Sequence, residues 1–118
     1  FKNINFFIKN LYEFWHEKIA QEINKNPAKI IVNLASQEYF SAINPNKINK
    51  KIIEIIFQEK KNGNLKTIGI NSKKARGLIT NFAIKNKISK PENLQEFDAD
   101  NYRFNSSLSN NEKWFFTR

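Results

Sequence analysis

The stretch "KIIEIIFQEKKNGNLKTIGI", residues 51–70, restricts the fold more than any other part of the chain. Asn62-Gly63 separates two runs rich in β-branched residues, and this dipeptide favours a two-residue hairpin turn because both central residues need a positive φ. A turn of this length fixes the strand register. The predicted cross-strand pairs are Lys61 with Asn64, Glu59 with Lys66, Phe57 with Ile68, and Ile55 with Ile70.

Two helices and a strand are predicted ahead of this hairpin. Apolar residues spaced three or four positions apart predict an amphipathic helix that ends near "NKNP", residues 24–27. These apolar residues are Ile8, Leu11, Tyr12, Trp15, Ile19 and Ile23. "KIIVNLAS", residues 29–36, predicts a short strand buried on both faces, and Ser36 is the expected cap of a short helix through "SQEYF".

A helix, a shorter helix and a second hairpin are predicted after residue 70. The long helix is expected to run from Ser72 to about Lys87 and to bury Ala75, Leu78, Ile79 and Phe82. Pro91 is expected to start a short helix in "SKPENLQEF", and "YRFNSSLSNNEKWFFTR" predicts the closing hairpin. The sequence therefore predicts an α+β fold, in which amphipathic helices pack on a small mixed sheet.

Composition narrows the classes of function. Twenty Lys and Arg residues against 11 Asp and Glu residues give a formal net charge of +9, which favours polyanionic partners. The chain has no cysteine and one histidine, His16, and no clustered acidic pattern, so we expect neither a metal site nor a cofactor. The early apolar cluster "INFFI" is too short for a membrane span, so no membrane association is expected.

The stretch "NSKKARG", residues 71–77, is the strongest candidate for a binding site. It places Lys73, Lys74 and Arg76 in the predicted first turn of the long helix, where backbone dipoles disfavour positive charge. Free N–H groups, several cations and the small Gly77 together suit a phosphate or another anion. The alternative is a solvated helix start whose lysines point away from the helix axis.

A second polar cluster lies at the carboxyl end of the first predicted strand. Asn33 and Ser36 lie where open α/β sheets usually bind ligands, although from residue types alone a turn at Asn33 and a helix cap at Ser36 are the favoured interpretation. Asp98 and Asp100 are interpreted as turn formers rather than as cation ligands. No pattern of nucleophile and acid or base is recognisable, so no catalytic residue is assigned and an enzyme is not the favoured class.

Five blocks of the sequence resemble successive blocks of the YaaA peroxide-stress family. They are "LYEFW", "IVNLASQEYF", "EKKNGNLKTIGINSKKARGLITNF", "ISKPENLQEF" and "YRFNSSLSNNEKWFFTR". The blocks follow the order found in the family, whose proteins are about twice as long. The resemblance therefore implies that residues 1–118 are one portion of a larger single domain, the C-terminal half, with the N-terminal half of the same protein as its partner.

The resemblance also implies a function. It implies a cytoplasmic bacterial protein of the hydrogen-peroxide response that limits free intracellular iron and protects against oxidative damage through DNA binding by a basic surface. The family's "KKARG" block maps to residues 73–77, so DNA or another polyanion is the expected partner. Two alternatives stay open: an enzyme that binds a nucleotide or small anionic substrate between "NLAS" and "KKARG", and a scaffold that completes the sheet of the longer protein.

Overall fold

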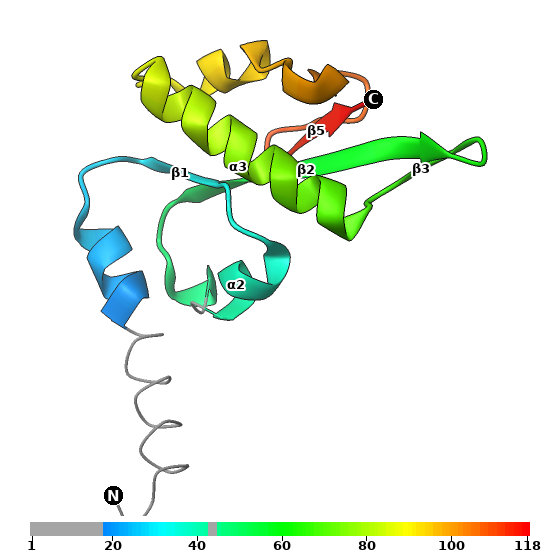
Figure 1. Ribbon diagram of the computed structural model, residues 1–118. Helices are drawn as coiled ribbons and strands as arrows, with labels where there is room; N and C mark the ends of the chain where they lie inside the picture. Colours follow the sequence, from blue (N-terminus) through cyan, green and yellow to red (C-terminus); the bar gives the residue numbers. More distant parts are fainter. Residues whose placement is uncertain (1–17, 43–44) are drawn as a thin grey trace, which may run out of the picture. The chain divides into compact units, whose positions relative to one another are not determined.

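The computed structural model describes residues 18–42 and 45–118, and Figure 1 shows the course of the chain. The described residues form helices and a five-stranded sheet, which confirms the α+β class. The chain divides into two compact units. The first unit comprises Phe1–Ile31 and Ala35–Lys51, and the second comprises Val32–Leu34 and Ile52–Arg118.

The sheet is mixed, with the strand order β1-β2-β5-β4 and with β3 paired to β2. The strands are β1 (Ile30–Asn33), β2 (Lys51–Lys61), β3 (Asn64–Lys66), β4 (Arg103–Phe104) and β5 (Lys113–Thr117). β2 runs parallel to β5 and antiparallel to β3, whereas β4 and β5 form the predicted closing hairpin. β1 is the short strand predicted in residues 29–36, but Ile30, Ile31 and Val32 are half-buried rather than buried on both faces.

The Asn62-Gly63 hairpin is confirmed next to its turn and wrong farther away. Asn62 and Gly63 both have a positive φ, 54° and 81°, and the pairs Lys61–Asn64 and Glu59–Lys66 form as predicted. β3 then ends at Lys66, so the predicted partners of the earlier β2 residues do not pair with them. The parallel strand β5 pairs with this part of β2 instead: Ile55 lies opposite Trp114, and Phe57 lies opposite Phe116.

The long helix α3 spans Gly69–Lys85, so it begins three residues before the predicted start at Ser72. Its buried residues are Ser72, Ala75 and Ile79. Phe82 is half-buried, and Leu78, predicted to be buried, is 39% exposed. Because the helix begins at Gly69, Ser72 lies inside α3 rather than at its end, and Ser72 is buried in the core.

Aromatic side chains dominate the core of the second unit. Phe57 is 1% exposed, and its ring lies 5.1 Å from Tyr102, 5.5 Å from Phe116 and 6.1 Å from Phe97, measured between centroids. Phe82 of α3 joins this cluster through an edge contact with Phe97. Burial of such rings stabilises the unit strongly because each removes a large apolar area from water.

Two 3-10 helices connect α3 to β4. The first is η2 (Pro91–Glu96), which begins at the predicted proline, and the second is η3 (Ala99–Asn101). α3 packs against η3, and β4 packs against η2. In Figure 1 this connection, coloured yellow to orange, runs beside α3. It therefore encloses the aromatic core between the helix and the closing hairpin.

The described residues of the first unit are largely helical. Residues 18–25 are helical and end where "NKNP" predicts, followed in this unit by α2 (Gln37–Ala42) and η1 (Pro45–Lys47). The Asn24 side chain donates a hydrogen bond to the Lys47 carbonyl over 2.8 Å and accepts one from the Asn49 amide over 2.9 Å. The predicted helical residues Ile8, Leu11, Tyr12 and Trp15 lie outside the described residues.

Candidate polyanion-binding surface

The candidate cations lie in the second turn of α3 rather than in the first. Because the helix begins at Gly69, the N–H groups of its open end belong to Gly69, Ile70 and Asn71, and the amide of Ser72 already donates to the Ile68 carbonyl over 2.8 Å. The unfavourable dipole expected for cations in the first turn is therefore smaller than predicted, because this effect falls off within one turn.

Lys73 and Lys74 are exposed, whereas Arg76 is half-buried. The Arg76 guanidinium donates a hydrogen bond from Nη1 to the Ser72 hydroxyl oxygen over 2.9 Å. This contact holds Arg76 along the helix, whereas the two lysines are exposed to solvent. We call Lys73, Lys74, Arg76 and Gly77 together the α3 cationic surface.

Gly77 lies within α3 at an exposed position. A Cβ atom built on Gly77 meets no atom within 4 Å, so packing does not require glycine here. Its φ is not positive, so backbone conformation does not require glycine either. Glycine inside a helix costs about 1 kcal/mol relative to alanine. The absence of a side chain leaves the backbone beside Lys73 and Lys74 open to close approach.

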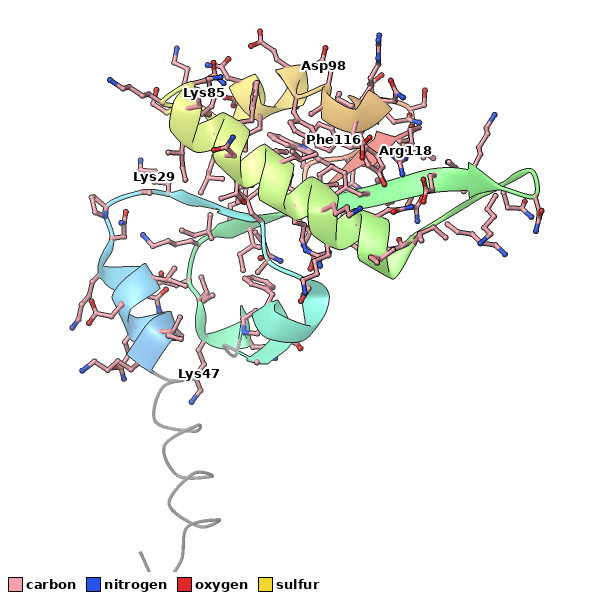
Figure 2. The ribbon with its side chains drawn as sticks, viewed as in Figure 1. Lys29, Lys47, Lys85, Asp98, Phe116 and Arg118 are labelled. Atoms are coloured by element: carbon pink, nitrogen blue, oxygen red, sulfur yellow. The ribbon has the colours of Figure 1, made fainter. Side chains whose placement is uncertain are left out.

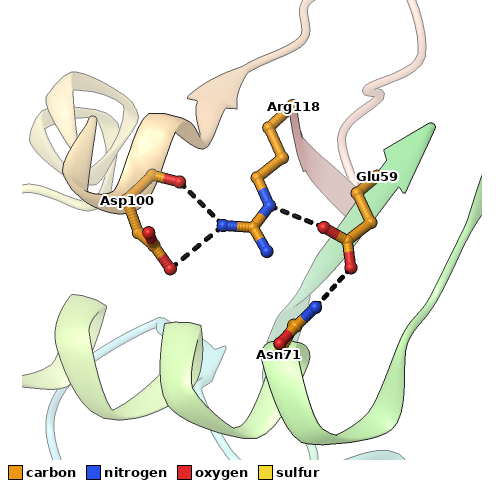
Figure 3. Close-up of polar contacts among 4 residues, drawn as sticks. All are labelled: Glu59, Asn71, Asp100 and Arg118. Carbon is orange, nitrogen blue, oxygen red and sulfur yellow. Dashed lines mark hydrogen bonds and ion pairs between the residues drawn. The ribbon is translucent and has the colours of Figure 1, made fainter.

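A polar cluster that the sequence did not predict lies at the start of α3 (Figure 3). The Asn71 side chain donates from Nδ2 to Glu59 Oε1 over 2.6 Å, and Arg118 Nε donates to Glu59 Oε2 over 2.7 Å. Both oxygens of the Glu59 carboxylate are thus bound. We call Glu59, Asn71, Asp100 and Arg118 the Glu59 cluster; it joins β2, α3, η3 and the residue that follows β5.

Arg118 is held on three sides. Its Nη1 group donates to the Asp100 carbonyl over 3.0 Å and pairs with Asp100 Oδ2 at the same distance. The guanidinium carbon lies 4.4 Å from the centroid of the Tyr102 ring, a distance typical of a cation–π contact. Asp100 has a φ of 55°, so it forms a turn as predicted, and its carboxylate also pairs with Arg118. Figure 2 shows Arg118 next to buried Phe116 at the end of the chain.

Hydrogen bonds shift the pKa values of Glu59 and Arg118 in this cluster. The hydrogen bond from Asn71, followed by that from Arg118, lowers the pKa of Glu59 below its usual 4.5. The bond to Glu59 raises the pKa of Arg118, and burial raises the pKa of Tyr102. Glu59 therefore carries a negative charge beside Asn71, two residues before Lys73, near the helix end that favours anions.

Asn33 and Ser36 occupy the ends of secondary-structure elements, as predicted. Asn33 is the last residue of β1 and is 6% exposed. Ser36 immediately precedes α2, and its carbonyl accepts the first helical hydrogen bond, from the Phe40 amide over 2.9 Å. Asn33 belongs to the second unit and Ser36 to the first. The shared cleft between these residues and the α3 cationic surface stays a prediction.

Within residues 18–42 and 45–118, no three His, Cys, Asp or Glu side chains are grouped closely enough to hold a metal ion. His16 lies outside these ranges. No helix in the same part of the chain combines the length and the apolar character needed to cross a membrane.

Comparison with known proteins places these residues in a family context. A family model described as peroxide stress protein YaaA matches residues 2–108, a range that contains Glu59, Asn71 and the α3 cationic surface. A UPF0246 protein of Acaryochloris marina is 47% identical over 112 residues, and one of Bordetella petrii is 43% identical over 114 residues. A third, from Idiomarina loihiensis, is 44% identical over 114 residues.

The same matches show how much of each relative this chain covers. Each covers 93% of this chain and 44% of the relative. The chain thus spans less than half the length of the curated relatives that it matches.

Proposed function

Because the chain belongs to the YaaA peroxide-stress protein family, we propose that its role in the peroxide response is to bind DNA through the α3 cationic surface. The observation that carries this proposal is the exposure of Lys73 and Lys74 beside Gly77, on a helix anchored in the aromatic core. Exposed lysines that neutralise DNA phosphates release the cations condensed on the DNA, which favours binding, and the open glycine backbone permits close approach.

Binding of this kind positions a protein on DNA without reading sequence. Contacts to phosphate oxygens carry no base information, so the affinity should be nearly independent of sequence and should fall steeply with salt. The net charge of +9 adds a long-range attraction to any polyanion. We therefore expect weak discrimination between duplexes and rapid association at low ionic strength.

The test is the salt dependence of affinity for a short DNA duplex, measured with the complete family protein that contains this chain. Each phosphate contact contributes about 0.9 to the slope of log affinity against log salt concentration. The triple variant Lys73→Ala, Lys74→Ala, Arg76→Ala should lower the slope by about two to three. A slope that stays at the wild-type value would overturn the assignment.

A matched control removes the same charge elsewhere. Lys85, Lys90 and Arg103 are exposed residues of the same unit, and Lys85 marks the far end of α3 (Figure 2). The variant Lys85→Ala, Lys90→Ala, Arg103→Ala changes net charge by the same amount as the test variant. It should change the slope by less than one contact, about 0.9.

We further propose that the protein acts in the bacterial cytoplasm, where this binding protects DNA and the protein limits free intracellular iron. The support is the family membership together with the basic composition. A strain that lacks the protein can be complemented with the wild type or the triple variant and exposed to hydrogen peroxide. Loosely bound iron and DNA lesions should both rise without the protein, and the triple variant should fail to lower the lesions.

A further inference from the structure

The first turn of α3 has little stabilisation of its own. The N-cap residue Ile68 has an extended backbone and offers no capping side chain, and the first turn contains no acidic residue. Gly69 is a poor helix former, and Ile70 is 69% exposed, so its side chain adds little packing. A helix start of this kind frays unless another element holds it.

Glu59 of β2 supplies that hold from outside the helix. Glu59 is paired with Lys66 of β3, and the preceding residue Gln58 is paired with Thr117 of β5. The backbone that carries the Glu59 carboxylate is therefore fixed within the sheet. The Glu59 side chain is 16% exposed and reaches Asn71, the third residue of α3. A bond between a charged oxygen and an amide is stronger than a neutral one.

Arg118 fixes the carboxylate from the opposite side. Its backbone amide donates to the Gln58 carbonyl over 3.2 Å, and its carbonyl accepts from the Lys60 amide over 3.1 Å. The two backbone bonds flank Glu59 in sequence, so Arg118 is fixed to the same stretch of β2. The Glu59 carboxylate therefore has one orientation, and Asn71 is bound at a defined point of the sheet.

We propose that Glu59 is a positioning residue for the α3 cationic surface. By holding Asn71, it fixes the first turn of α3, and with it the direction in which Lys73 and Lys74, two and three residues later, leave the helix. The proposal rests on the proposed function, because the surface that is positioned is the one assigned to DNA. Glu59 itself is not expected to touch DNA, because its charge repels phosphate.

Because Glu59 repels phosphate, the proposal predicts a change in DNA affinity opposite to the change that electrostatics alone predicts. Removal of one negative charge strengthens binding to a polyanion if electrostatics alone acts. If Glu59 positions the lysines, its removal weakens binding although the net charge rises. We expect Glu59→Ala to weaken duplex affinity at least about threefold in the full-length family protein at fixed salt.

Three further variants sharpen this test. Asn71→Ala removes the same link without a change of charge and should weaken binding to a similar degree. Glu59→Gln keeps an oxygen that can accept from Asn71, so it should retain more affinity than Glu59→Ala. Glu112→Gln removes one charge from an exposed residue ahead of β5 and should leave affinity equal or slightly higher. An affinity that rises in Glu59→Ala as it does in Glu112→Gln overturns the proposal.

Hydrogen exchange separates this proposal from the proposed function. In Asn71→Ala the amides of residues 72–74 should exchange about five- to tenfold faster, whereas those of residues 79–83 in the second half of α3 should not change. Unchanged exchange at residues 72–74 overturns the positioning role even if DNA binds. If wild-type protein shows no salt-dependent DNA affinity, the proposed function fails, and faster exchange at these amides still supports the hold on the helix start.

Discussion

Arg118 and Glu59 are 59 positions apart in the chain, yet Arg118 Nε lies 2.7 Å from Glu59 Oε2. The pair ties the last residue, Arg118, to the end of β2 that lies beside the start of α3. Its side chains are 22% and 16% exposed, so water screens the interaction less than at an open surface. The same carboxylate binds Asn71, which makes the pair part of the support of α3.

The Glu59 pair predicts acid sensitivity. The pKa of Glu59 is lower in the folded chain than its usual 4.5, so the unfolded chain binds more protons in this range. The stabilisation is therefore present above pH 4.5 and is lost as the pH falls through the lower folded pKa. Wild-type protein should keep its thermal stability advantage over Glu59→Gln above pH 4.5 and lose it progressively as the pH falls below that value.

The comparison with Glu112→Gln isolates the cause. Both variants lose one carboxylate, but Glu112 is exposed. Its melting temperature should follow that of wild type across the same pH series. If the gap between wild type and Glu59→Gln is constant at all pH values, the ionised carboxylate is not what stabilises the fold.

Gly63→Ala and Gly77→Ala should have opposite effects on stability. Neither position has an atom within 4 Å of a new Cβ, so sterics are matched and backbone conformation differs. Gly63 has a φ of 81°, where a side chain is strained, so Gly63→Ala should lower the free energy of unfolding by about 1–2 kcal/mol. Gly77 lies within α3, so Gly77→Ala should raise it by about 1 kcal/mol.

Chemical denaturation measures both effects, and DNA affinity gives Gly77 a second readout. If the open backbone admits a phosphate, Gly77→Ala should bind duplex DNA more weakly although it is more stable. An alanine variant that is more stable and binds as well as wild type would show that the glycine is not needed for approach.

The parts of the fold that follow from local rules were predictable from the sequence. The Asn62-Gly63 turn fixed the pairs next to it, and "YRFNSSLSNNEKWFFTR" predicted the β4–β5 hairpin because strands and turn are contiguous. The predicted pairs of Phe57 and Ile55 were wrong because β5 pairs with this part of β2, and no local pattern predicts such a long-range pairing. The start of α3 was missed because Ile68 is an N-cap without a capping side chain.

The candidate site likewise contains features that were predictable from the sequence and features that were not. Helical periodicity predicted the exposure of Lys73 but not that Lys74 is exposed and Arg76 half-buried. Leu78 was misplaced because it lies at the edge of the buried stripe. The Glu59 cluster was not predictable from sequence, because it joins residues from four separate elements. The one sequence signal, Glu59 opposite Lys66, is confirmed as a register pair, but the Glu59 carboxylate forms its ion pair with Arg118.

The aromatic core predicts which apolar residues matter for stability. Phe57 is 1% exposed and contacts three other aromatic rings, whereas Ile84 is 71% exposed on α3. Phe57→Ala should lower the free energy of unfolding by about 3–5 kcal/mol, which approaches the total stability of a small domain.

Phe57→Leu retains most of the apolar volume, so it should cost about 1–2 kcal/mol and keep the protein folded enough to measure. Ile84→Ala should change stability by no more than about 0.5 kcal/mol, because an exposed side chain leaves no cavity. Urea unfolding of the two variants gives the comparison. If Ile84→Ala costs as much as Phe57→Leu, the Ile84 side chain packs against another part of the molecule.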